Sequence, residues 1–238
     1  MLENINLKNI LFLDIETVPQ FSKYEELPES FADLWDKKCL TFRKETEVEL
    51  PASLYRRAGI YAEFGKIICI SCGAFNAENK FRIKSFYGHD EKKILVDFSL
   101  MLQKSFFSSD KLLCAHNGKE FDFPYICRRL LINHLPLPAI LNIAGKKPWE
   151  VAHIDTMELW KFGDFKSYSS LILLAAIFEI PTPKDDIDGS NVWKVYWEEN
   201  NLERIVKYCQ KDVLTVAQIF RKFRCEDLIK LEDVVFAE

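Results

Sequence analysis

The sequence lacks any long apolar run and any excess of positive charge. No segment approaches the roughly 20 consecutive apolar residues that a membrane-spanning helix requires. The formal net charge is -4, so the chain is not of the basic type that coats nucleic acid through its overall field. Acidic and amide residues precede the first short apolar run, unlike the basic start of a secretory signal. We therefore expect a cytoplasmic protein with no membrane partner.

Cysteine is present, but it lacks the spacing of a disulfide framework or of a zinc site. The chain has 7 cysteines, an odd number at irregular intervals, which favours a reducing compartment. Cys69 and Cys72 form a CxxC, but they lie in an apolar, strand-like run. No second CxxC or nearby Cys/His pair completes a zinc site in the sequence. We therefore predict that this pair belongs to the core.

Internal repeats and low-complexity tracts are also absent, and the remaining pattern is typical of one α/β domain. With 238 residues, 48% of them hydrophobic, the chain can bury a substantial core. We expect strands at 10–15, 67–75, 81–87, 112–115 and 153–155. We expect helices around 94–102, from 123 onward, over 167–178 and over 201–221. This order predicts a central mixed five-stranded sheet flanked by helices, in a single domain 1–238 with an insertion at about 19–65.

The apolar run of the first strand stops at two acids, Asp14 and Glu16. Residues two apart on a strand point to the same side of it. Burying one carboxylate costs several kcal/mol unless it is paired, protonated or bound to a metal, so two together favour a divalent cation. The alternative is that Glu16 lies exposed in a loop, and an Asp-x-Glu motif alone does not exclude this.

Two later segments also carry acids that a single site could use. Asn117-Gly118-Lys119-Glu120-Phe121-Asp122 leaves a short strand, turns at the glycine and enters a helix, where Asp122 could instead be a plain N-cap. Tyr208 and Asp212 lie four residues apart on the long helix, so their Cβ atoms are about 6 Å apart on one face. The alternative for this second pair is a surface tyrosine beside a solvated acid.

Together and in this order, these segments resemble the DEDD superfamily of 3′→5′ exonucleases, also called DnaQ-like, which has the ribonuclease H-like fold. The family carries Asp-x-Glu on its first strand, Asn-x-x-x-Phe-Asp before a helix and Tyr-x-x-x-Asp on a late helix. One subgroup has a histidine where this chain has Lys207, so the chain is similar to the tyrosine subgroup. The stretch 184–190, Lys-Asp-Asp-Ile-Asp-Gly-Ser, resembles stand-alone relatives of the family B DNA polymerase proofreading domain.

The resemblance implies an enzyme that removes nucleoside monophosphates from a 3′ end, with two divalent cations, Mg²⁺ or Mn²⁺, as cofactors. The residues that it places at the catalytic centre are four carboxylate metal ligands and one tyrosine: Asp14, Glu16, Asp122, Asp212 and Tyr208. In this scheme Tyr208 orients the attacking water, because a phenol with a pKa near 10 is a poor base at neutral pH. Thr17, Asn117 and Phe121 are candidates for contacting the terminal nucleotide, with packing as their alternative role.

The expected substrate is the single-stranded 3′ end of a nucleic acid, DNA in the first place. An exonuclease of RNA or oligoribonucleotides is one alternative, because the choice depends on pocket contacts to the 2′ position. A catalytically silent nucleic-acid-binding module of the same fold is another, and an endonuclease of the ribonuclease H-like type is a third. The late Tyr-x-x-x-Asp favours the exonuclease.

Three further polar residues resemble site residues but have structural explanations. Asp155 ends a short strand, and we interpret it as a helix cap or a supporting residue and not as a metal ligand. His116 and His153 lie in apolar strand segments, where a histidine is more often a hydrogen-bonded core residue than a catalyst. We assign none of the three to catalysis.

Overall fold

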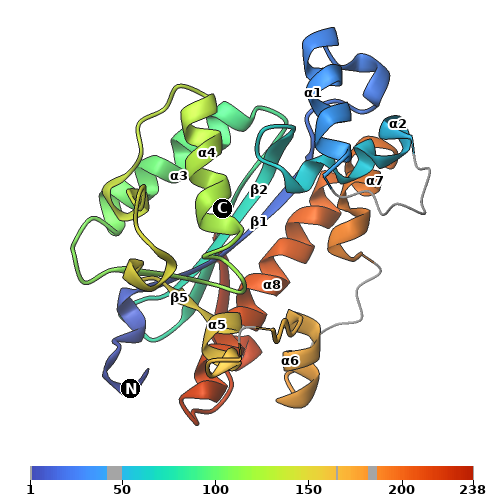
Figure 1. The fold of residues 1–238 in the computed structure, drawn as a ribbon. Helices are drawn as coiled ribbons and strands as arrows, with labels where there is room; N and C mark the ends of the chain where they lie inside the picture. Colours follow the sequence, from blue (N-terminus) through green and yellow to red (C-terminus); the bar gives the residue numbers. More distant parts are fainter. Residues whose placement is uncertain (1, 42–49, 165, 182–186, 238) are drawn as a thin grey trace.

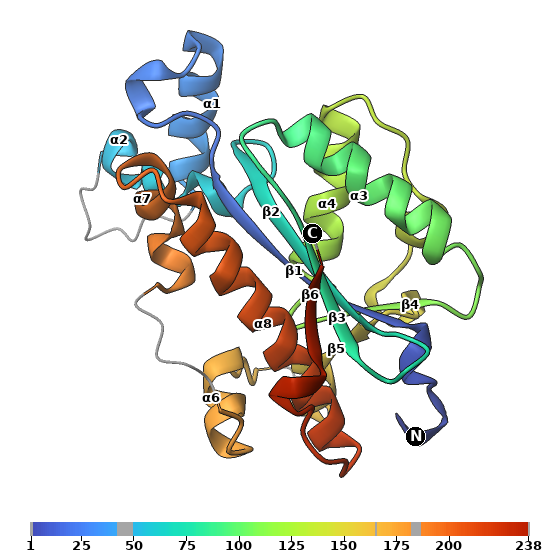
Figure 2. The ribbon, with the colours of Figure 1, turned by 180° about the vertical axis from the view of Figure 1, so that it is seen from behind.

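The computed structural model describes residues 2–41, 50–164, 166–181 and 187–237. Its centre is a mixed sheet of six strands in the order β5-β4-β1-β2-β3-β6 (Figures 1 and 2). The strands are β1 (Ile10–Pro19), β2 (Gly65–Phe75), β3 (Phe81–Tyr87), β4 (Leu112–Ala115), β5 (Ile154–Asp155) and β6 (Val234–Ala237). β1, β2 and β3 form an antiparallel meander, whereas β4 runs parallel to β1 and β5 parallel to β4. The predicted α/β architecture, a mixed sheet flanked by helices, is confirmed.

The sheet has one strand more than the five predicted, and this part of the prediction is wrong. The extra strand, β6, pairs in parallel with β3 and forms one edge of the sheet (Figure 2). Val235 and Phe236 are 43% and 61% exposed, so the segment carries no buried face that a period of two would reveal. Its position depends on long-range contacts, such as the ion pair between Lys80 Nζ and Asp233 Oδ1 at 2.6 Å. Sequence pattern alone could not supply these contacts.

Helices cover both faces of the sheet. They are α1 (Glu29–Cys39), α2 (Pro51–Leu54), α3 (Glu91–Ser105), α4 (Asp122–Ile132), α5 (Thr156–Lys161), α6 (Leu171–Ile177), α7 (Val192–Trp197) and α8 (Leu202–Phe223). α3 and α4 lie on one face and α8 crosses the other (Figure 1). The helix predicted over 167–178 is shorter than expected, and α5 and α7 were not predicted. Within the described ranges, no helix has the length and apolar character needed to cross a membrane.

The alternation of β1 side chains decides which face carries the candidate acids. Leu11, Leu13 and Ile15 pack with α3 and α4, whereas Ile10 and Phe12 pack with α8. Because successive side chains on a strand point to opposite faces, Asp14 and Glu16 lie on the α8 side. The two acids therefore face the long helix that carries Tyr208 and Asp212.

The sequence pattern indicated that the acids stand at the end of the first strand. In the structure they lie within β1 instead. β1 continues to Pro19, but its parallel neighbour β4 pairs only with Ile10–Phe12. Past Phe12, the edge of β1 toward β4 has no ladder partner among the described residues, while β2 still pairs with the opposite edge as far as Pro19. The carboxylates therefore stand just beyond the point where β4 stops, where the sheet opens.

The segment between β1 and β2 contributes α1, α2 and a 3₁₀ helix, η4 (Tyr55–Ile60), beside the open end of the sheet. It has a small core of its own around the fully buried Trp35. The Gly59 carbonyl accepts hydrogen bonds from Thr17 Oγ1 at 2.8 Å and from Tyr125 Oη at 2.7 Å. A Cβ at Gly59 would lie 3.0 Å from the backbone of Val18, so a side chain there would displace η4. Glycine thus allows η4 to sit directly against β1.

Candidate active site

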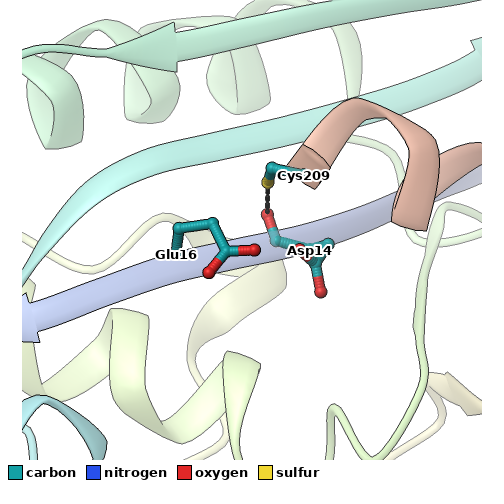
Figure 3. Close-up of side chains that lie close together, drawn as sticks. All are labelled: Asp14, Glu16 and Cys209. Carbon is teal, nitrogen blue, oxygen red and sulfur yellow. Dashed lines mark hydrogen bonds between the residues drawn. The ribbon is translucent and has the colours of Figure 1, made fainter. Parts of the chain in front are cut away.

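Asp14, Glu16 and Cys209 form a tight group between β1 and α8 (Figure 3). One potential ligand atom of each lies within 4.8 Å of the others, and the described residues contain no second group of this kind. The two acids come from neighbouring positions on one face of β1, and Cys209 comes from α8. The Cys209 thiol donates a hydrogen bond to the backbone oxygen of Asp14 at 3.4 Å. This contact fixes the helix against the strand that carries the acids.

Glu16 is buried and Asp14 is half-buried with its Oδ2 enclosed, and the group of three contains no positive charge. Burial raises the pKa of Asp14 well above its ordinary value, and the negative charges of Asp212 and Asp122 raise it further. Burial is also the main cause of the raised pKa of Glu16, and the charges of Asp14 and Asp212 raise it further. Asp14 Oδ2 is a buried oxygen with no hydrogen-bond partner. Because Glu16 is 6% exposed and lies inside β1, its alternative position in an exposed loop is wrong.

Asp122 joins this group from the other face through α4. It is the first residue of that helix, and the residue at the cap position is Phe121, which makes no side-chain capping bond. The carboxylate of Asp122 accepts a hydrogen bond from the Ile15 backbone N–H at 3.2 Å, between the two acids of β1. Burial raises the pKa of Asp122 to about 7. The alternative of a plain N-cap is therefore wrong, because the side chain is directed to β1.

Asp155 organises the turn that leads to Asp122. Its carboxylate accepts from the backbone N–H groups of Asn117 and Lys119, each at 3.0 Å. It also caps α5 by accepting from the N–H of Met157 at 2.9 Å and of Glu158 at 3.2 Å. With four donors this buried carboxylate is fully satisfied, which agrees with its interpretation as a cap.

The turn differs in one detail from the expectation that glycine makes the bend. The residue in the left-handed region is Asn117, with φ 63°, a conformation that asparagine adopts more readily than most residues. Gly118 is needed for space instead, because a Cβ there would lie 2.4 Å from the Cβ of Ala115. The pair Asn-Gly therefore serves two separate purposes in placing α4.

Tyr208 and Asp212 face the same site from α8, as their spacing predicted. Both side chains are half-buried. Burial raises the pKa of the Tyr208 phenol, and the charges of Asp212, Glu16 and Asp14 and a hydrogen bond with Asp212 raise it further. The phenol is therefore neutral near pH 7 and can donate a hydrogen bond, but it is a poor proton acceptor. The alternative of a surface tyrosine beside a solvated acid does not describe this arrangement.

A groove of about 620 Å³ lies over the acids. Its floor includes Asp14, Glu16 and Asp212, and Tyr208 lies on its wall. Thr17 and Phe121 also line it, whereas Asn117 does not. Thr17 already uses its hydroxyl to hold Gly59, and the Phe121 ring lies 5.3 Å from that of Tyr125. Of the three candidates for nucleotide contact, the structure therefore brings two to the groove.

Several groove residues were missed by sequence reasoning. Arg56 and Arg57 of η4 line the groove, although the sequence analysis assigned them no role at the site. Trp193 of α7 and Asn191 line the groove as well. One sequence pattern could have drawn attention to the arginines. They follow Pro51, a residue typical of a helix start, in a segment whose apolar residues indicate that it packs against the rest of the protein. Nothing in the local pattern places Trp193 near Asp14.

The 184–190 stretch is described only in part. Residues 184–186 lie outside the described residues. Ile187 is buried, and the carboxylate of Asp188 accepts from the backbone N–H of Ser190 at 2.8 Å. Gly189 and Ser190 line the groove. The second half of the stretch thus borders the site.

The histidines and the CxxC pair have structural roles, as predicted. His153 accepts from the Leu113 N–H at 3.3 Å and contacts the Ile140 carbonyl at 2.8 Å through its other nitrogen. His116 contacts Thr156 Oγ1 and the Ser169 carbonyl, each at 2.9 Å, and burial lowers the pKa of both rings. Cys69 and Cys72 belong to different core clusters, on opposite faces of β2, so they cannot bind one ion together.

Comparison with known proteins identifies a family whose model matches most of this chain. A family model described as a predicted 3′-5′ exonuclease related to the exonuclease domain of PolB matches residues 60–232. The match includes Asp122, Tyr208 and Asp212, whereas Asp14 and Glu16 precede it. Among solved structures, the chain is similar to the family B DNA polymerase of the hyperthermophilic archaeon Pyrobaculum calidifontis, with a TM-score of 0.48 and 16% identity. That alignment covers 87% of this chain and 24% of the polymerase chain.

Proposed function

Because the chain belongs to the family of predicted 3′-5′ exonucleases related to the exonuclease domain of PolB, we propose that it is a metal-dependent 3′→5′ exonuclease. The single observation that carries this proposal is the buried group of Asp14 and Glu16 beneath the groove, with Asp122 and Asp212 beside it. The reaction is hydrolysis of the last phosphodiester, which releases a nucleoside monophosphate. The cytoplasmic location and the single-domain organisation expected from the sequence stay predictions.

The residues of the group fit divalent cations such as Mg²⁺ or Mn²⁺. Carboxylate oxygens are the ligands that these hard cations prefer. The partnerless Asp14 Oδ2 and the raised pKa values of Asp14 and Glu16 indicate a site short of positive charge. We propose that four carboxylates would hold the ions, with Glu16 and Asp212 on one, Asp122 on the other and Asp14 contributing to both. Bound there, the ions would activate water and offset the charge of the scissile phosphate and the leaving 3′ oxygen.

The other residues of the site orient the reactants. Tyr208 keeps its proton, because the surrounding acids disfavour the phenolate, and its hydroxyl, which bonds Asp212, would orient the attacking water. Asp122 holds Ile15 by its backbone N–H, so that Asp14 and Glu16 keep their spacing on β1. Phe121 offers a ring at the groove to the terminal base. Thr17 supports η4 through Gly59, and its contact with the nucleotide stays a prediction.

The proposed substrate is a single-stranded 3′ end, with DNA preferred to RNA. No specific contact to a 2′ hydroxyl supports this preference, so an exonuclease of RNA or oligoribonucleotides is the alternative within the same reaction. A silent binding module is the alternative from another class. The complete set of four acids and one tyrosine supports the enzyme, because a binding module would not need to keep them.

The test uses 5′-labelled single-stranded DNA and RNA of equal sequence, each with Mg²⁺, Mn²⁺ or EDTA. We expect a ladder of products shortened from the 3′ end, abolished by EDTA and by Asp14→Asn. Exposed Asp33, changed to Asn, provides a matched control that removes one negative charge outside the groove. Degradation that persists in EDTA, or an Asp14→Asn variant as active as the control, would contradict the proposal.

A further inference from the structure

The groove over the acids continues into a second hollow of about 300 Å³. The two hollows share three lining residues, Pro19, Arg56 and Trp193, so they meet between η4 and α7. From the proposed function, on which this step depends, we infer that the strand leaves the carboxylates between Arg56 and Trp193. The second hollow would then bind the nucleotides that precede the terminal one.

The junction carries the groups that a single strand needs. Arg56 is an exposed cation, and no carboxylate of the residues that the structure describes forms an ion pair with it. A guanidinium in such a place can bind a phosphate through two hydrogen bonds. Trp193 is half-buried and presents an indole to both hollows. Bases of any sequence stack on such a ring, because each has a π face.

The second hollow is aromatic and not strongly basic. Four of its lining residues are aromatic: Tyr24, Tyr55, Trp193 and Trp197. Its charged lining is mixed, with Lys23 and Arg56 beside Glu25 and Glu198. A surface of this composition favours unpaired bases over a phosphate backbone. A base stacked inside a duplex has both faces covered by its neighbours, so the hollow selects single-stranded nucleic acid.

Both walls of the junction are fixed to β1. The wall that carries Arg56 is held by the two hydrogen bonds to the Gly59 carbonyl. The opposite wall is held by the Trp197 indole, which donates to the Pro19 carbonyl at 3.1 Å. Thr17 and Pro19 lie on the strand that carries Asp14 and Glu16, whereas Tyr125 belongs to α4. The path is therefore built in a fixed position relative to the acids, which suits a site that must place one phosphodiester.

Binding tests the path without relying on catalysis. The probe is 5′-fluorescein-labelled dT12, titrated with the full chain in EDTA and followed by fluorescence anisotropy. We expect Arg56→Ala and Trp193→Ala each to weaken the Kd about tenfold, while Trp193→Phe recovers most of the lost affinity because it restores a ring. Matched controls are Arg82→Ala on β3 and Trp149→Ala, both exposed and outside the two hollows. Thermal melting of every variant verifies that it is folded.

Hydrolysis assays with Mn²⁺ then test the strand path and the exonuclease activity independently of each other. We expect the loss caused by Arg56→Ala and by Trp193→Ala to grow with length, from under threefold on the dinucleotide TpT to about tenfold in KM on dT12. Equal Kd values for these variants and the controls would overturn the path even if the wild type degrades dT12. Conversely, weakened binding with no metal-dependent hydrolysis by the wild type would support the path and contradict the exonuclease.

Discussion

Two of the places where the described residues bury carboxylates treat them in opposite ways. Glu91, on α3, accepts hydrogen bonds from the Ile67 N–H at 2.7 Å, from Arg129 Nε at 2.8 Å and from Asn133 Nδ2 at 2.9 Å. Arg129 is itself 3% exposed, so this ion pair is enclosed. Asp14, by contrast, has a buried oxygen with no partner, and the charges of Asp212 and Asp122 raise its pKa further.

The difference shows which buried charge serves the fold and which serves chemistry. The carboxylate of Glu91 has its countercharge inside the chain, and it joins α3, α4 and β2. The acids of β1 repel one another, so the fold has to hold them together at a cost in stability. Such a loss of stability is expected at a functional site, where a bound ligand offsets the repulsion. The comparison therefore predicts opposite outcomes when each charge is removed.

The largest effect is expected from Asp14→Asn, which keeps the shape of the side chain and removes its charge. Loss of a metal ligand should lower kcat about a thousandfold, or about 4 kcal/mol in the activation free energy. The free energy of unfolding in EDTA should stay equal or rise, because one repulsive charge is gone. Activity assays and urea denaturation measure the two quantities. A variant that is both active and destabilised would show that Asp14 serves the fold.

Arg129→Met reverses this pattern. The substitution leaves Glu91 buried without its countercharge, which should cost about 3–5 kcal/mol in the free energy of unfolding. Adding Glu91→Gln should recover part of that loss, because the remaining group is then neutral. Activity per folded molecule should change little, since neither residue lines the groove. Urea denaturation measures this free energy of unfolding. A decrease of less than about 1 kcal/mol would mean that water compensates the charge of Glu91 once Arg129 is gone.

The pH dependence of stability sharpens the contrast at Asp122. Its pKa is raised to about 7 by burial, above the ordinary value of 3.8. A raised carboxyl pKa means that the folded protein binds the proton more tightly than the unfolded chain does. The contribution to stability is therefore complete below about pH 4 and is lost as the pH rises to about 7. In EDTA, the unfolding free energy of the wild type minus that of Asp122→Asn should fall by up to about 4 kcal/mol across this range. A constant difference would contradict the raised pKa.

The smallest effect is expected from Tyr208→Phe. Removing the hydroxyl that orients the proposed water should lower kcat about tenfold. Because the phenol acts as a donor and not as a base, the pH profile of kcat should keep its shape. A profile that loses its alkaline limb in the variant would assign proton transfer to Tyr208. Rate measurements between pH 6 and 10 with Mn²⁺ distinguish the two roles.

The sequence predicted most of the elements that place the site, because their patterns are local. The apolar run from Ile10 gave β1, and the spacing of Tyr208 and Asp212 placed both on one face of α8. β3 and β4 have the predicted bounds, because turn-forming residues flank them. The family motif then indicated which acids to compare. These inferences needed only periodicity and the order of the motifs.

The features that the sequence did not predict depend on contacts between distant segments. Cys209 donates to a backbone oxygen of Asp14, and nothing around residue 209 indicates this partner. Arg56 reaches the groove only because Gly59 allows η4 to lie against β1. The orientation of Asp122 toward Ile15, and not toward its own helix, likewise depends on how α4 meets the sheet. Local propensity carries no information on such pairings.

The most direct test of the central claim is to count the cations that the acids of β1 bind. Electron paramagnetic resonance measures free Mn²⁺, so a titration gives the number bound by the wild type, by Asp14→Asn and by the control Asp33→Asn. The expectation is two bound ions for the wild type and the control, and one or none for Asp14→Asn. A folded Glu91→Gln variant should bind as many ions as the wild type. Equal Mn²⁺ binding by the wild type and Asp14→Asn would contradict this expectation.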